Sequence, residues 1–139
     1  MERHPKSNTL LQLFIQNATD AIDLRVRLEP FIQHALRKGI PSLFNSIRYL
    51  YTDSWKINVV EEILNDYMIS LTKYASFDDQ SSKEDPTVLL WTLYSLSQHY
   101  SAVHDPSQAI KVIDLAIKHT PTLVELYMQK ARILKVLEF

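Results

Sequence analysis

The sequence predicts an all-α protein in which helical hairpins stack on one another as part of an α-solenoid. The chain of 139 residues contains one glycine, Gly39, and little strand-like alternation of polar and apolar residues, so a sheet is disfavoured. Hydrophobic residues make up 46% of the chain and recur at helical spacing. Between residues 93 and 121, their order is typical of two paired helices.

The pairing motif combines bulky and small residues on two helices. Its members are Leu93, Leu96, Ser97 and Tyr100 on the first helix, Ala109, Ile113 and Ala116 on the second, and a terminating Pro121. The pattern resembles a tetratricopeptide repeat, whose antiparallel helices pack together and stack into a right-handed superhelix. Small residues at Ser97 and Ala109 let the two helices approach closely. An ordinary amphipathic hairpin with the same apolar period is the alternative.

The first part of the chain predicts an arm followed by a helix. Residues 1–19 are interpreted as a polar arm. Asp20 is a suitable cap for a helix that runs to Lys38 and ends at Gly39. Pro30 predicts either a helix start or a kink within that segment, because proline lacks the backbone N–H group.

Two further helices complete the region of residues 20–76, which we interpret as degenerate repeat helices. A short helix opens at Ser42, and a longer one begins at Asp53 or Ser54 and extends to about Tyr74. The apolar residues of the longer helix recur every three or four positions, at Ile57, Val60, Ile63, Leu64, Tyr67 and Leu71.

Residues 77–85 predict an acidic linker between the two halves of the chain. Residues 53–85 carry eight acidic against three basic side chains, and four of the acids flank the polar stretch of residues 80–82. Polar runs between periodic segments are usually solvated loops, although an acidic docking segment is the alternative. The clear repeat spans residues 86–121. Its first helix is predicted to begin at Asp85 or Thr87, and the turn before its second helix ends at Asp105 and Pro106.

The last residues, 122–139, predict the first helix of a truncated next repeat, running from Leu123 to about Leu137. Its bulky, small and bulky positions fall on Tyr127, Ala131 and Leu134, whereas Lys130 replaces an expected leucine. Four apolar residues are expected to lack a partner within the chain: Ile133, Val136, Leu137 and Phe139. Self-association through this end is therefore expected, unless the helix packs back on the preceding pair as a cap.

Several functional classes are disfavoured by composition. The net charge is −1 and no long apolar run is present, so neither a nucleic-acid surface nor a membrane span is predicted. With one glycine there is no phosphate-binding loop, and with no cysteine there are no disulfides or thiolate ligands, which suits a cytoplasmic protein. His99 and His104 do not share a helical face, so no metal site is predicted.

Other polar residues predict structural roles. His99 is interpreted as a residue that hydrogen-bonds across the repeat. Glu61, Glu62 and Asp66 are interpreted as solubilising charges on an exposed helix face. No catalytic residue is predicted.

Three blocks of sequence point to a narrower resemblance. Residues 36–44 with Leu50 and Tyr51, residues 90–100 and residues 116–126 occur in an order that resembles the large auxiliary subunit of the N-terminal acetyltransferase A complex. The resemblance covers the chain from about residue 20 onward. It implies an internal segment of a tetratricopeptide superhelix that wraps and activates an acetyl-CoA-dependent catalytic subunit and helps hold the complex at the ribosome.

The resemblance also implies an anion site. Members of that family bind an inositol polyphosphate between their two subunits, and Arg132 and Lys135 match basic positions used there. Paired cations on one side of a helix can hold an anion through charge-assisted hydrogen bonds. Ordinary solvated helix charges are the alternative. No cofactor of the chain's own is expected, because acetyl-CoA would bind the catalytic partner.

A partner-binding face is expected on the concave side of the first repeat helices. In the clear repeat it includes Trp91, Tyr94 and Gln98, and in the truncated repeat Met128. Aromatic anchors suit a protein partner, although Trp91 and Tyr94 are equally suited to packing on the preceding helices. A stand-alone peptide-binding module, such as a cochaperone, is the alternative function. Residues 86–103 contain no lysine or arginine to hold a peptide carboxylate, which disfavours that alternative.

Overall fold

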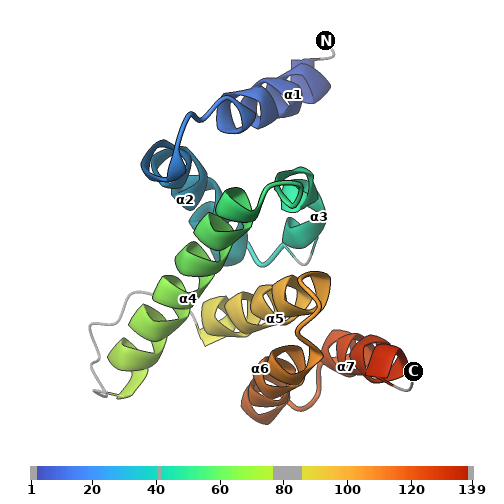
Figure 1. Ribbon diagram of the computed structural model, residues 1–139. Coiled ribbons are helices and arrows are strands. Elements are labelled where there is room, and N and C mark those ends of the chain that lie inside the picture. The colour runs from blue at the N-terminus through green and yellow to red at the C-terminus, as the bar shows by residue number, and fades with distance from the viewer. Residues whose placement is uncertain (1–2, 41, 77–85, 138–139) are drawn as a thin grey trace.

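Seven α-helices and one short 3-10 helix stack in chain order in the computed structural model, which describes residues 3–40, 42–76 and 86–137 (Figure 1). The stack starts with α1 at the top of Figure 1 and ends with α6 and α7 at the bottom. No strand occurs among these residues, which confirms the all-α prediction. The elements are α1 (Arg3–Gln16), α2 (Ala21–Arg37), α3 (Leu43–Ile47), η1 (Arg48–Leu50), α4 (Ser54–Ser76), α5 (Pro86–Ala102), α6 (Pro106–His119) and α7 (Val124–Leu137).

The boundaries of α2 follow from its cap and its glycine. The Asp20 carboxylate accepts a hydrogen bond from the Asp23 backbone N–H at 2.8 Å, as expected of a helix cap. Pro30 lies inside α2 and does not start it. Gly39 ends the turn after the helix with φ +68°, a conformation that favours glycine. A side chain there would also crowd Trp91, whose indole nitrogen would lie 3.2 Å from an added Cβ.

The N-terminal segment is a helix, and the prediction of a polar arm over residues 1–19 was wrong. Ile15 near the end of α1 is 1% exposed and belongs to the core. The Arg27 guanidinium lies 4.6 Å from the centre of the Phe14 ring and donates to the Phe14 carbonyl oxygen at 2.6 Å. The polar first nine residues obscured the apolar run that follows them, and one side of that run packs on α2.

The hairpin of α5 and α6 matches the repeat motif residue by residue. All seven motif positions on the two helices are buried, and the α5–α6 contact is the most extensive in the structure. The Ser97 hydroxyl donates to the Ala109 carbonyl oxygen at 3.1 Å. Ser97 of α5 therefore meets the backbone of α6 directly. This confirms the predicted reason for small residues at Ser97 and Ala109, which is the close approach of the two helices.

Helix α7 packs back on α6, which corrects one prediction about its apolar side. Ile133 is 1% exposed, although it was expected to lack a partner. It lies 34 residues after His99, one repeat period, and both residues face the preceding helix pair. Val136 and Leu137, also expected to lack a partner, are exposed on α7, whereas Phe139 lies outside the described residues.

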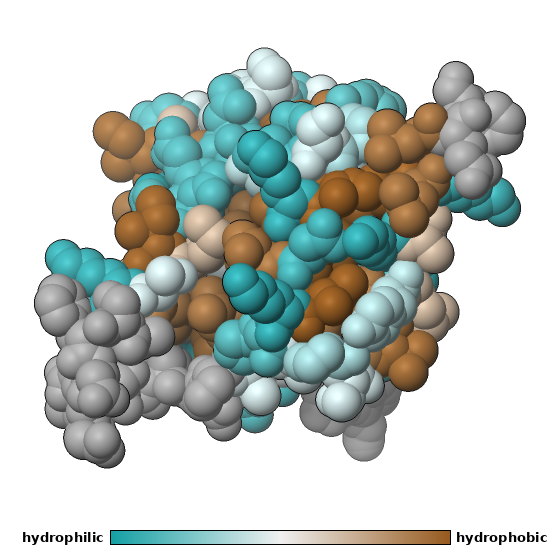
Figure 2. Space-filling view, turned by 90° about the horizontal axis from the view of Figure 1, so that it is seen from below, coloured by the Kyte–Doolittle hydropathy of each residue, from teal (hydrophilic) through white to brown (hydrophobic). Residues whose placement is uncertain are grey.

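Hydrophobic and hydrophilic surface are mixed on the face formed by α6 and α7 (Figure 2). Exposed apolar side chains there include Leu115 of α6 and Val136 of α7. The self-association expected through this end stays a prediction. The predicted linker, residues 77–85, lies outside the part of the chain that the structure describes. Among the described residues, no helix is long and apolar enough to cross a membrane.

Candidate functional site

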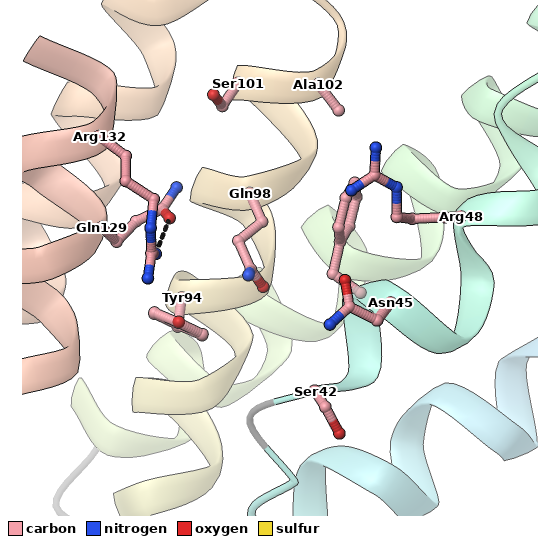
Figure 3. A pocket seen from close by; sticks show the side chains of 10 residues that line it. Ser42, Asn45, Arg48, Tyr94, Gln98, Ser101, Ala102, Gln129 and Arg132 are labelled. Carbon is pink, nitrogen blue, oxygen red and sulfur yellow. Dashed lines mark hydrogen bonds between the residues drawn. The ribbon is translucent and has the colours of Figure 1, made fainter. Parts of the chain in front are cut away.

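A polar hollow of about 540 Å³ lies between three elements of the stack (Figure 3). Helix α5 runs through the middle of the view, α7 supplies one wall, and α3 with η1 supplies the other. The residues that line it are Ser42, Phe44, Asn45 and Arg48 on one side, Tyr94, Gln98, Ser101 and Ala102 on α5, and Gln129 and Arg132 on α7.

The α5 side of the hollow is one helical face. Tyr94, Gln98 and Ser101 follow one another at intervals of four and three residues, so their side chains point the same way. Tyr94 is largely buried, and Gln98 is half-buried. The Gln98 Oε1 atom is shielded from solvent and has no hydrogen-bond partner among the described residues. A buried amide oxygen without a donor is unfavourable, so a rotation of the Gln98 side chain that turns this oxygen into the hollow would let a ligand donate to it.

The α7 wall is fixed by a chain of hydrogen bonds. Arg132 Nη1 donates to Gln129 Oε1 at 3.2 Å, and Gln129 Nε2 donates to Ser97 Oγ at 3.3 Å. Because Ser97 in turn donates to the Ala109 carbonyl, this series of hydrogen bonds connects α7, α5 and α6. Gln129 is buried, so these bonds satisfy an amide that would otherwise destabilise the interface. The Arg132 guanidinium is thereby held at the edge of the hollow.

The opposite wall contributes a second arginine. The Arg48 guanidinium lies 5.8 Å from the centre of the Phe44 ring. Asn45 lies one helical turn before it on the same wall. Among the described residues, neither Arg48 nor Arg132 forms an ion pair with a carboxylate, and no acidic residue lines the hollow. The hollow therefore carries net positive charge.

A second hollow of about 750 Å³ continues from the first along α5. Its lining shares Phe44, Arg48, Ser101 and Ala102 with the first hollow. The remaining lining residues are Tyr51, Thr52, Ile57, Val103 and His104, none of them acidic. We call these two adjoining hollows the α5 groove. Arg48 lines both of them.

The structure brings together three of the six residues predicted as binding positions. Tyr94, Gln98 and Arg132 line the α5 groove. Trp91 does not, because its indole packs beside Gly39 and makes an edge contact with Tyr94, with ring centres 5.5 Å apart. Of the two roles predicted for Trp91, the structure shows packing on the preceding helices.

The other two predicted positions, Met128 and Lys135, are exposed on α7 and do not line the groove. Sequence reasoning missed Arg48 and Asn45, since they lie on a short helix that follows no repeat register. Gln129 was also missed. Its polar side chain lies on the buried side of α7, between Leu126 and Ile133, and that break in the apolar pattern was the available signal.

His99 is the centre of a separate buried network. Its side chain is 0% exposed, with Nδ1 2.6 Å from the Tyr51 hydroxyl and Nε2 2.9 Å from Glu61 Oε1. The carboxylate can only accept, so Nε2–H donates to Glu61 and Nδ1 of the neutral ring accepts from Tyr51. His99 was predicted to be a structural residue that bonds across the repeat, and it is a buried structural residue, but both of its partners precede α5. Glu61 was predicted to be solubilising and instead accepts this bond.

Burial sets the protonation states of this network. Burial lowers the pKa of His99, and the hydrogen bond to Glu61 and its charge oppose this shift without reversing it. Burial also raises the pKa of Tyr51, with a smaller contribution from the negative charge of Glu61. Both shifts favour a neutral imidazole that accepts from a protonated phenol at neutral pH.

We expect the chain to lose stability as the pH falls below about 6.5, the usual pKa of histidine. The pKa of His99 is lower in the folded chain, so the unfolded chain binds the proton more tightly and acid favours unfolding. One such group contributes at most about 1.4 kcal/mol per pH unit between the unfolded and folded pKa values. Urea unfolding at pH 7.5 and 5.5 measures the change in the free energy of unfolding, and His99→Gln should show a smaller decrease than the original chain. An equal decrease in both proteins would contradict the assignment of this pH dependence to His99.

Glu62 and Asp66 of α4 form an ion-pair cluster with Arg25 of α2. Arg25 lies 2.9 Å from Asp66, 3.8 Å from Glu62 and 3.2 Å from Glu29. Hydrogen bonds to Glu29 and Asp66 raise the pKa of Arg25. These acids therefore do more than solubilise a face, because they connect α4 to α2. Exposed pairs of this kind each contribute less than about 1 kcal/mol.

Comparison with known families decides the classification. The sequence model of the family described as N-terminal acetyltransferase A, auxiliary subunit, matches residues 1–137. This chain belongs to that family. The chain is 34% identical over 134 residues to NAA15, the auxiliary subunit of the N-terminal acetyltransferase A complex of Arabidopsis thaliana. It is 34% identical over 136 residues to human N-alpha-acetyltransferase 16, a NatA auxiliary subunit.

The chain spans only a small part of the length of these relatives. The alignments include 96% of this chain but 15% of the Arabidopsis protein and 16% of the human protein. A solved structure of Naa15 and Naa10 bound to HypK-THB contains a chain with the same fold, at a TM-score of 0.69 and 22% identity. That likeness covers 96% of this chain and 21% of the solved chain, and it confirms the helical solenoid architecture.

Proposed function

We propose that this chain is a non-catalytic scaffold segment that helps to hold and activate the catalytic subunit of a protein N-terminal acetyltransferase. The observation that supports this proposal most directly is the family match over residues 1–137. The solved chain of similar fold is Naa15 in a structure with Naa10, which supports an acetyltransferase partner for this segment. The segment would act in the cytoplasm, and the whole auxiliary subunit would dock the complex at the ribosome.

The stacked architecture suits such a role. A solenoid buries a continuous core and leaves long surfaces open along the stack, which are suited to wrapping a partner. Here the core runs from Ile15 in α1 to Ile133 in α7, whereas the polar α5 groove remains open. The chain itself would provide a binding surface for the catalytic subunit, and acetyl-CoA would bind that subunit.

Co-expression with a Naa10-type catalytic subunit tests the proposal. The tagged 139-residue chain should recover the catalytic subunit by affinity purification, and the purified chain alone should transfer no acetyl group from acetyl-CoA to a peptide. Failure to recover the catalytic subunit would argue against a holding function for this segment. Acetyl transfer by the chain alone would argue against a non-catalytic one.

We also propose that Arg132 and Lys135 contribute to an inositol polyphosphate site at the interface with the catalytic subunit. The two residues are three positions apart on α7, and both are exposed. Changing both to glutamate should weaken binding of inositol hexakisphosphate to the assembled complex, measured by calorimetry. Unchanged affinity would remove this part of the proposal.

A further inference from the structure

We propose that the α5 groove binds an extended acidic segment of a partner polypeptide. This proposal goes beyond the scaffold function and does not depend on it, because it is based on the residues of the groove, of which Arg132 is shared with the inositol polyphosphate site proposed above. No catalytic subunit is needed to test it.

The charge of the groove selects an acidic ligand. Arg48 and Arg132 stand on opposite walls, with Gln98 between them (Figure 3). No acidic residue lines either hollow, and among the described residues neither arginine is paired with a carboxylate. A guanidinium binds a carboxylate through two parallel hydrogen bonds, which suits the aspartates and glutamates of a peptide.

The amide of Gln98 selects a ligand that also donates hydrogen bonds. Its Oε1 has no donor within the described structure, and a rotation of the side chain that turns Oε1 into the groove would let a ligand donate to it. A polyphosphate at neutral pH offers mainly acceptor oxygens, whereas each non-proline residue of a peptide offers a backbone N–H. Asn45 lies on the facing wall and offers both a donor and an acceptor. An acidic peptide therefore satisfies the arginines and Gln98 together, which a simple anion does not.

The shape of the groove suits an extended chain. The two hollows adjoin along α5, where both are lined by Arg48, Ser101 and Ala102. The side chains of Ser101 and Ala102 are small, so a peptide backbone can approach the helix closely there. An extended peptide advances by about 3.3 Å per residue and can follow both hollows, whereas a compact ligand fills one.

A peptide of alternating aspartate and threonine, ten residues long and fluorescently labelled, is a suitable probe. The alternating asparagine and threonine peptide has the same shape without the charge. Fluorescence anisotropy with the 139-residue chain at 0.15 M salt should show the acidic peptide binding at least tenfold more tightly than the neutral one. Equal affinity for the two peptides, or binding of neither, would overturn the proposal.

Variants of the chain locate the binding. Arg48→Ala and Gln98→Leu should each raise the Kd of the acidic peptide about tenfold, since each removes one well-oriented polar contact. Lys118→Ala, an exposed cation on α6 outside the groove, removes the same charge as Arg48→Ala and should leave the Kd unchanged. If Lys118→Ala weakens binding as much as Arg48→Ala, the attraction is general and the groove is not the site.

Circular dichroism of each variant separates lost binding from lost folding. If Gln98→Leu proves unstable, Gln98→Glu keeps the size of the side chain and should repel the acidic peptide. Inositol hexakisphosphate provides a further comparison. If it binds the chain with an affinity that depends on Arg48 and Gln98 and displaces the peptide, the groove is a phosphate site and the peptide proposal is wrong.

Discussion

Replacing Ala109 with leucine should lower the free energy of unfolding by about 3 kcal/mol. Ala109 is 0% exposed where α6 crosses α5, and its carbonyl oxygen accepts from the Ser97 hydroxyl at 3.1 Å. A larger side chain must push the helices apart, which strains the packing and lengthens this hydrogen bond. Urea unfolding followed by circular dichroism at 222 nm measures the change, which should appear as a lower midpoint.

The matched control is Ala131→Leu on α7. Ala131 occupies the small position of its own repeat helix, which corresponds to Ser97 one repeat earlier, but it is exposed in this chain. The same chemical change there should alter stability by less than about 0.5 kcal/mol. If Ala109→Leu were equally well tolerated, the close approach of α5 and α6 would not be a source of stability.

The parts of the fold that the sequence predicted correctly are those in which neighbouring residues determine the structure. Asp20 caps α2 through a residue three positions later, and Gly39 supplies the left-handed turn that ends it. The α5–α6 hairpin follows from spacing within one repeat. The helical N-terminus was missed because packing on α2 stabilises α1, and no local pattern in its polar first half shows that contact.

The groove was predictable to the extent that it follows the repeat. Gln98 and Arg132 lie 34 residues apart, at the same position of successive first helices, and both line it. Arg48 comes from a segment without repeat register, so its approach to α5 depends on the tertiary fold. The hydrogen bond from His99 to Glu61 was hidden for the same reason, since 38 residues separate the two.

Polar contacts lie on both sides of α5, in addition to the apolar packing that is usual between repeats. His99 meets Glu61 of α4 on one side, and Ser97 meets Gln129 of α7 on the other. Hydrophobic contacts tolerate a small sliding of one helix along another, whereas a hydrogen bond holds one alignment. We therefore expect these two contacts to fix the alignment of α5 with its neighbours, which in turn fixes the width of the groove.

Replacing His99 with alanine should lower the free energy of unfolding by about 3 kcal/mol, because it empties a fully buried site and removes two hydrogen bonds. The imidazole is 0% exposed and packs at the edge of the Tyr51 and Tyr100 rings, with ring centres 5.7 Å and 5.1 Å apart. The Tyr51 hydroxyl would lose its acceptor in a partly buried position. Chemical denaturation at pH 7.5, where the native imidazole is neutral, measures the loss.

Comparison with Glu61→Gln distinguishes the hydrogen bond from the charge of its acceptor. The glutamine oxygen still accepts from His99 Nε2–H, and the Glu61 side chain is 40% exposed, so we expect a loss below about 1 kcal/mol. Glu61→Ala, which removes the acceptor, should cost more than Glu61→Gln. If His99→Ala were no more destabilising than Glu61→Gln, the buried ring would contribute little, and α4 would be held against α5 by apolar packing and the hydrogen bond from Asn65 to the Tyr100 hydroxyl.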